Sequence, residues 1–198
     1  MQKSTTTVIS SCTIAAGETT VLADCTASDL SRVTELIFTA NATFNAAATE
    51  GLTVYFYTSI DNSTYDTGFW DYWDIENYRQ VGYASGTDMF VIGETLTAAA
   101  AGTGTVVGWS LSSGTFAGND AAGNVYLANL TGTFTDTQAL TGGTNGAATQ
   151  DGSVAAHAAT VTYYPSCCAP MYIKALIAND DTSQSATSVS LIATERSI

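Results

Sequence analysis

Basic side chains are scarce in this sequence. Its 198 residues include five Lys and Arg against 18 Asp and Glu, so the net charge is −13 at neutral pH. Binding to nucleic acid depends on Lys and Arg that displace counterions from phosphates, and anionic membrane surfaces attract the same side chains. We therefore expect no nucleic-acid partner and no membrane partner.

Long apolar runs are also missing, and the Lys and Gln residues of long helices are few. No segment approaches the roughly 18 uninterrupted apolar residues of a membrane span, and residues 1–7 lack the apolar stretch of a secretory signal. Two lysines and five glutamines are too few for a coiled coil or a helical bundle. We expect a protein that is made in a cytoplasm without a signal peptide.

Residues that carry catalysis are few. The single histidine, His157, has no Cys or carboxylate at metal-ligand spacing. The chain has no Gly-x-Ser-x-Gly nucleophile motif and no Gly-Lys-Ser/Thr phosphate loop. We expect no enzymatic activity, no metal and no cofactor.

Small residues dominate what is present. Thr, Ala, Ser and Gly make up 98 positions, whereas Leu, Ile, Val and Phe supply 40, near the lower limit for a packed core. Segments 33–39 and 52–58 are rich in β-branched and aromatic residues, which is typical of strands. In the second segment, Leu52, Val54 and Phe56 alternate with Thr53, Tyr55 and Tyr57, so the two sets should face opposite sides. Segments 171–178 and 187–194 are interpreted as a hairpin-like pair. The predicted fold is all-β.

The middle of the chain differs from its ends. Residues 86–152 are rich in Gly and Thr and contain no Lys, Arg or Pro. Phe90, Leu96, Thr97, Gly102 and Thr105 recur 44 positions later as Phe134, Leu140, Thr141, Gly146 and Thr149. Each unit should form a strand, a Gly-rich turn that permits positive φ, and a second strand. We expect residues 1–85 and 153–198 to form an antiparallel, jelly-roll-like β-sandwich, with 86–152 as a small inserted β-unit containing two repeats.

Several phrases resemble those of Gly/Thr-rich β-units in tailed-bacteriophage virion proteins. They are GETLT at 93–97, LTGTF at 130–134, the strand–turn segment 57–67 and the C-terminal segment from 172 onward. The resemblance implies a virion structural protein, and within that class we favour a capsid decoration (cement) protein. Its partners would be the major capsid protein or other virion proteins. A tail, neck or fibre component is the alternative.

Assembly is also expected from composition. A core with so few large apolar residues gains from burial between subunits, so we expect a homo-oligomer, and a trimer would suit local three-fold axes.

Aromatic and acidic residues are densest between Asp61 and Tyr83. The candidate contact residues are Tyr65, Phe69, Trp70, Tyr72, Trp73 and Tyr78. We rank a protein interface first, because Tyr and Trp dominate interface hot spots. Glycan binding by ring stacking ranks second, which would make the chain a carbohydrate-binding module. Glycoside hydrolysis by a pair such as Asp71 and Asp74 ranks third, and a Ca²⁺ site at Asp61, Asn62 and Asp66 is a further alternative.

Four cysteines complete the candidates. A bridge between Cys12 and Cys25 would close a short loop and stabilise the chain by roughly 3 kcal/mol. Cys167 and Cys168 are adjacent, and a bond between them would be strained. Because a cytoplasm is reducing, all four should begin as thiols.

Overall fold

A computed structural model describes residues 2–165 and 172–197 of the chain. The described residues are all-β: they form fourteen strands and two short 3-10 helices. By compactness the chain divides into two units. Unit 1 comprises 1–43, 51–75 and 159–198, and unit 2 comprises 44–50 and 76–158. The described part contains no helix that is long and apolar enough to cross a membrane.

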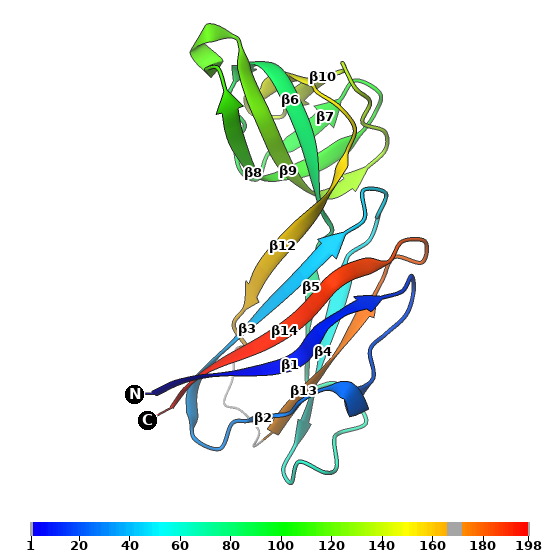
Figure 1. Cartoon of the computed structure of the whole chain (residues 1–198), viewed down its shortest axis with the longest axis vertical. Coiled ribbons are helices and arrows are strands. Elements are labelled where there is room, and N and C mark those ends of the chain that lie inside the picture. The colour runs from blue at the N-terminus through cyan, green and yellow to red at the C-terminus, as the bar shows by residue number, and fades with distance from the viewer. Residues whose placement is uncertain (1, 166–171, 198) are drawn as a thin grey trace. The chain divides into compact units, whose positions relative to one another are not determined.

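Unit 1 is built on two groups of strands. One is ordered β1-β14-β3 and the other β2-β13-β4-β5 (Figure 1). The strands are β1 (Gln2–Ile14), β2 (Ser28–Asp29), β3 (Val33–Phe44), β4 (Leu52–Ser59), β5 (Asp71–Ile75), β13 (Tyr172–Asn179) and β14 (Ala186–Ser197), with the helix η1 (Leu22–Asp24) between β1 and β2.

Alternation in β4 creates the core of unit 1. Leu52, Val54 and Phe56 are at most 1% exposed, which confirms the inward face predicted from the sequence. The Phe56 ring lies 4.5 Å from the ring of Phe38 in β3, so the two groups of strands share one apolar interior.

The predicted hairpin of β13 with β14 is wrong. β13 pairs with β4 and β2, whereas β14 pairs with β1 and β3. The polar connection is a structured crossing between the two groups of strands. The Asp181 carboxylate is buried and accepts the N–H groups of Ser183 and Gln184, each at 2.8 Å. A polar turn after a strand therefore does not fix which strand comes next in the sheet.

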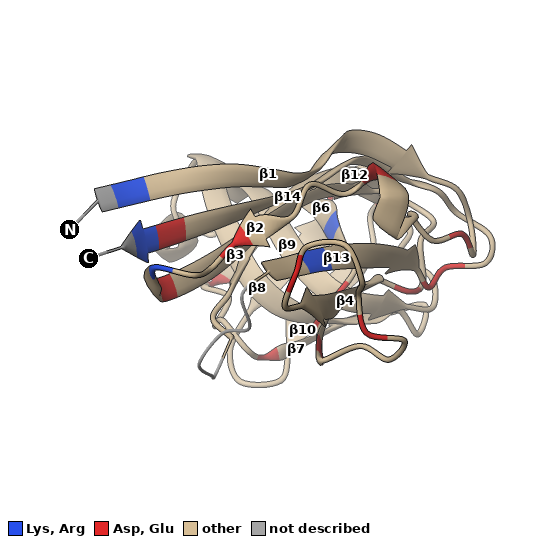
Figure 2. Ribbon diagram, turned by 90° about the horizontal axis from the view of Figure 1, so that it is seen from below, with Lys and Arg blue, Asp and Glu red and all other residues tan. Residues whose placement is uncertain are grey.

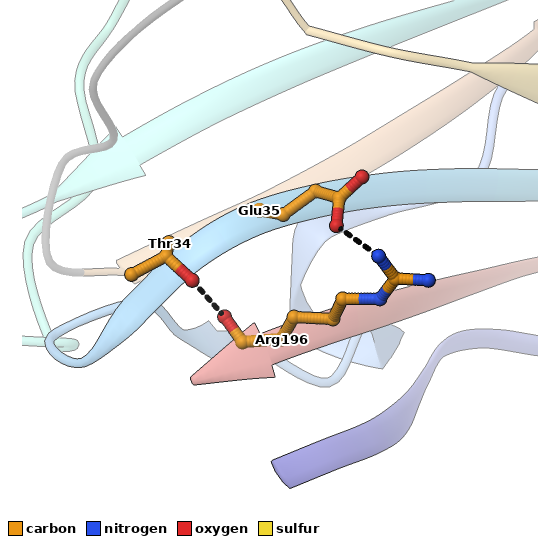
Figure 3. A network of polar contacts seen from close by, with 3 residues as sticks. All are labelled: Thr34, Glu35 and Arg196. Carbon is orange, nitrogen blue, oxygen red and sulfur yellow. Dashed lines mark hydrogen bonds and ion pairs between the residues drawn. The ribbon is translucent and has the colours of Figure 1, made fainter. Parts of the chain in front are cut away.

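The two termini lie side by side because β1 and β14 pair along their length (Figure 1). Near the C-terminus, Arg196 Nη1 donates to Glu35 Oε2 at 2.8 Å, and Thr34 Oγ1 donates to the Arg196 carbonyl at 3.0 Å (Figure 3). Both charged side chains are almost half exposed, so this ion pair contributes at most about 1 kcal/mol.

Unit 2 contains a closed six-stranded antiparallel barrel. Its hydrogen-bonded order is β6-β11-β10-β7-β8-β9, and β9 pairs back with β6. The strands are β6 (Tyr78–Asp88), β7 (Thr95–Ala98), β8 (Thr103–Ser113), β9 (Ala121–Thr131), β10 (Ala139–Gly142) and β11 (Ala147–Gln150), with the helix η2 (Phe116–Gly118) after β8. Strand β12 (Ala155–Tyr163) contributes residues to both units.

The barrel has an internal two-fold arrangement. Val81 pairs with Val125 in the β6–β9 ladder, and Thr97 pairs with Thr141 in the β7–β10 ladder. The members of each pair are 44 positions apart, so a local two-fold axis passes through each. We call β6–β8 the first repeat and β9–β11 the second repeat.

Reciprocal packing across this axis explains the recurring Phe and Gly. A Cβ atom at Gly102 would lie 2.5 Å from the Phe134 ring, and one at Gly146 would lie 2.5 Å from the Phe90 ring. Each repeat thus opens space for the ring of the other. The expected reason for these two glycines was wrong, since neither has a positive φ. Close approach of an aromatic ring requires them.

Candidate functional site

An aromatic face covers one side of the β2-β13-β4-β5 sheet. It begins in β4, where Tyr55 and Tyr57 point away from the core and are half-buried. Tyr72 lies directly opposite Tyr55 in the neighbouring edge strand β5 and is 52% exposed. The alternation of β4 therefore places tyrosines on the same surface as an exposed ring of β5.

Phe69 joins these rings from the loop between β4 and β5. Its ring lies 5.2 Å from the ring of Tyr55 and 5.9 Å from that of Tyr72, and it is 51% exposed. The next residue anchors the loop, because the Trp70 N–H donates to the Phe56 carbonyl at 2.7 Å. We call Tyr55, Phe69 and Tyr72 the three-ring cluster.

Strand β13 adds a cation to this face. Lys174 lies opposite Tyr57, and its Nζ lies 5.1 Å above the ring centroid of Tyr65. The same Nζ donates to the Leu22 carbonyl at 3.1 Å, which fixes the position of the charge. The Tyr65 hydroxyl donates to Asn62 Oδ1 at 2.7 Å. Burial, with a smaller contribution from the Asp61 carboxylate, raises the pKa of Tyr65.

The carboxylates of the β4–β5 loop bind their own loop. Asp61 Oδ1 accepts the N–H groups of Ser63 and Thr64, both at 2.9 Å. These hydrogen bonds hold the pKa of Asp61 far below its usual range. Asp66 accepts the Thr58 hydroxyl. Both carboxylates line a hollow of about 390 Å³ together with Ile60, which is 80% exposed. The loop geometry accounts for these acids without a cation.

Asp71 and Asp74 lie on opposite faces of β5. Asp71 is paired with the inward-facing Phe56 and accepts the Tyr163 hydroxyl. Asp74 is paired with Thr53, whose Oγ1 lies 3.2 Å from Asp74 Oδ1 and 2.8 Å from Asp180 Oδ2. Carboxylates on opposite faces of one strand cannot flank a single glycosidic bond, so this pair does not provide the geometry of a glycosidase.

The structure separates the six aromatic candidates. Phe69 and Tyr72 meet in the three-ring cluster, whereas Trp73 faces inward and stacks on Tyr163 at 5.4 Å. Tyr78 belongs to unit 2, where its ring packs at 6.2 Å from that of Phe44. Burial raises the pKa of Tyr78, as expected for a packed ring.

Three contributors to the face were not singled out from the sequence. Tyr55 and Tyr57 carried a usable signal, the alternation of β4. Lys174 carried none, because its place beside Tyr57 depends on a pairing between strands that are more than one hundred residues apart.

Cys12 and Cys25 are free thiols that line one hollow of about 340 Å³. The Cys25 thiol donates to the Ala175 carbonyl at 2.7 Å, and burial raises its pKa to about 11. Burial also raises the pKa of Cys12. The structure holds this pair reduced, and a disulfide between them under oxidising conditions stays a prediction. Cys167 and Cys168 lie outside the described residues.

Within the described ranges, 2–165 and 172–197, no three or more His, Cys, Asp and Glu side chains come together in an arrangement that could hold a metal ion. His157 stacks on Tyr126 with ring centroids 4.5 Å apart, and burial lowers its pKa. This histidine is a packing residue. In comparisons with known proteins, no family model matches the chain and no curated protein matches its sequence.

Proposed function

We propose that this chain is a structural protein that docks on another protein through the three-ring cluster. The observation that carries the proposal is that Phe69 and Tyr72 are both more than half exposed while their rings are fixed against each other and against Tyr55. Aromatic anchors held in place lose little entropy on binding and dominate interface energies.

The ring geometry favours a protein partner over a sugar. Stacking on a pyranose needs an open, flat ring face, but Phe69 meets Tyr72 edge-to-face at 76° and Tyr55 at 50°. The three rings are tilted against one another, so the cluster suits an apolar pocket in a protein surface better than the flat face of a sugar. Glycan binding remains the second candidate, supported by the carboxylates that border the face.

Within the structural class we propose a bacteriophage virion protein, and specifically a capsid decoration protein in contact with the major capsid protein. The support is the resemblance of segments 57–67, 93–97 and 130–134 to virion β-units and the exposed cluster on an all-β chain. We further propose that unit 1 is a jelly-roll-like sandwich and that the protein acts as a homo-oligomer, with a trimer favoured. A tail, neck or fibre position is the alternative within the virion.

Imaging of particles that carry labelled protein tests the placement. Label on the outer shell at symmetry axes is expected, whereas label confined to the tail or neck, or an absence of label from particles, would contradict it. The variant F69S/Y72S should lose at least about 2 kcal/mol of binding to the particles, as expected for hot-spot rings. The matched control is Y164S, which removes a 64% exposed ring outside the cluster and should bind like the parent. Binding to a glycan array that F69S/Y72S abolishes would favour the second candidate.

A further inference from the structure

The loop between β6 and β7 exposes a run of apolar side chains. Met89, Val91 and Ile92 are 54%, 39% and 70% exposed, whereas Phe90 between them is buried in the barrel. In β8, Leu111 is 47% exposed. These four are the exposed large apolar residues of unit 2, and none belongs to the second repeat. We call them the barrel patch.

Ring contacts fix the elements that carry the barrel patch. The Phe116 ring lies 6.4 Å from that of Phe90 and 5.4 Å from that of Trp109. Trp109 and Leu111 are two residues apart in β8 and therefore share a face. The Phe116 turn is itself fixed, because the Thr115 hydroxyl accepts the Gly118 N–H at 3.0 Å. The elements that carry these exposed side chains are therefore held in place by ring packing and by the Phe116 turn.

The second repeat is an internal control for the first. Thr133, Thr135 and Asp136 occupy the positions of Met89, Val91 and Ile92, around Phe134, which is buried like Phe90. The backbone turn is the same in both repeats: the Glu94 N–H donates to the Val91 carbonyl at 3.1 Å, and the Gln138 N–H donates to the Thr135 carbonyl at 3.3 Å. The same turn thus forms with polar residues, so the fold does not require an apolar surface here.

The negative charge of unit 2 limits which partners could bind the barrel patch. Unit 2 carries seven carboxylates and one basic side chain, Arg79, which is buried. Exposed carboxylates border the patch: Asp88 precedes Met89, and Asp120 accepts the Thr115 N–H at 2.8 Å in the Phe116 turn. Acidic positions recur over the molecule and basic ones are few (Figure 2). At this patch, the equally acidic patch of a second copy, or an anionic membrane, would be repelled, so contacts between copies of the chain would lie elsewhere.

We propose that the barrel patch is a docking site for a different protein whose apolar side chains are flanked by Lys and Arg. Burial of the apolar side chains would supply affinity, and the surrounding carboxylates would select the basic rim. This surface belongs to unit 2 and is independent of the three-ring cluster, so the chain would contact partners through two surfaces.

The test measures binding of a short synthetic peptide that alternates Leu and Lys to the full chain by NMR. Amide shifts are expected at Met89, Val91, Ile92 and Leu111 and not at 133–136. A peptide that alternates Ser and Lys, and one that alternates Leu and Glu, should each bind at least about tenfold more weakly. Equal binding of all three peptides, or shifts elsewhere, would overturn the proposal.

The repeat supplies matched variants. M89T/V91T/I92D copies the second repeat into the first and should weaken binding of the Leu/Lys peptide about tenfold or more. T133M/T135V places apolar residues of the first repeat in the second repeat. It should bind the Leu/Lys peptide at least as well as the parent, with new NMR amide shifts at 133–135. Unchanged affinity in M89T/V91T/I92D would overturn the proposal. The proposal would also be overturned if the parent chain self-associates, or binds phosphatidylcholine/phosphatidylglycerol vesicles, and M89T/V91T/I92D abolishes that binding. Either result would assign the patch to another occupant.

Discussion

The two repeats of the barrel share several buried residues and differ at the surface. Val81 and Val125, Phe90 and Phe134, and Leu96 and Leu140 are buried at equivalent positions. Their backbone hydrogen bonds also correspond: the Gly93 N–H donates to the Val106 carbonyl at 2.7 Å, and the Thr137 N–H donates to the Gln150 carbonyl at 2.9 Å. These shared buried residues are the ones that the barrel needs in both repeats.

Differences between the repeats show which positions the barrel leaves free. Glu94 and Gln138 are equivalent and reach equivalent loops, Glu94 to the N–H of Thr144 at 3.0 Å and Gln138 to the N–H of Ala100 at 3.3 Å. Here the charge differs but the role is shared. At the barrel patch, in contrast, the first repeat has apolar residues where the second repeat has polar ones, and the backbone turn is the same. Because the two repeats have the same turn but different exposed side chains, the apolar side chains of the first repeat point to a function at that surface.

The largest expected effect comes from the two phenylalanines. F90A and F134A should each lower the free energy of unfolding by about 3–5 kcal/mol, because each removes a buried ring and leaves a cavity. Urea denaturation of both variants measures this. The comparison predicts losses of similar size; a loss in only one would show that the two repeats do not contribute equally to the core.

The paired glycines should have the next largest effect. G102A and G146A place a methyl group 2.5 Å from the ring of the opposite repeat, so each should cost about 1–3 kcal/mol in unfolding free energy through overpacking. A matched control is G68A, since no atom lies within 4 Å of a Cβ at Gly68. Neutral G102A and G146A would contradict reciprocal packing.

Replacing the Glu94 carboxylate by an amide tests the comparison of the repeats through the pH dependence of stability. Burial of Glu94 would raise its pKa, but the N–H groups of Val91, Asn145, Thr144 and Gly146 outweigh burial and lower it below the usual range. A lowered folded-state pKa means that the stabilisation is fully present above the unfolded-state value of about 4.3 and is lost as pH falls through the lower folded-state value.

We therefore expect E94Q to lose about 1–3 kcal/mol at pH 7, because its amide cannot accept all of these N–H groups. The difference from the parent should shrink below about pH 4. The control Q138E, which has one acceptor contact at 3.3 Å, should change stability by less than about 0.5 kcal/mol. Denaturation at pH 7 and at several acidic values measures both; a pH-independent difference would contradict the account.

Local patterns in the sequence predicted local structure, and pairings between distant segments escaped them. The alternation of 52–58 predicted which side chains of β4 are buried, because a strand alternates regardless of its neighbours. The sheet membership of β13 and β14 depends on partners at β4 and β1, which no local pattern specifies. The repeat could be recognised from Phe90 and Phe134. Few residues of β6 recur in β9, Val81 and Val125 being one such match, so the sequence did not show that these two strands belong to the repeat.

The candidate site was predicted in part for the same reason. An aromatic-rich segment located Phe69 and Tyr72, yet composition could not distinguish them from Trp73, which faces the opposite side of β5. One residue of offset along a strand exchanges an exposed ring for a core ring. Tyr78 is close in sequence but packs in unit 2, because the chain changes units between Ile75 and Glu76.

The smallest expected effect gives the most direct test of the claim that the barrel does not require the exposed apolar residues of the first repeat. The measurement is the free energy of unfolding of M89T/V91T/I92D relative to the parent chain. Because the second repeat already folds with Thr133, Thr135 and Asp136, the account predicts a change within about 0.5 kcal/mol. A loss above about 2 kcal/mol would contradict it, because the exposed apolar residues would then be part of what holds the barrel together.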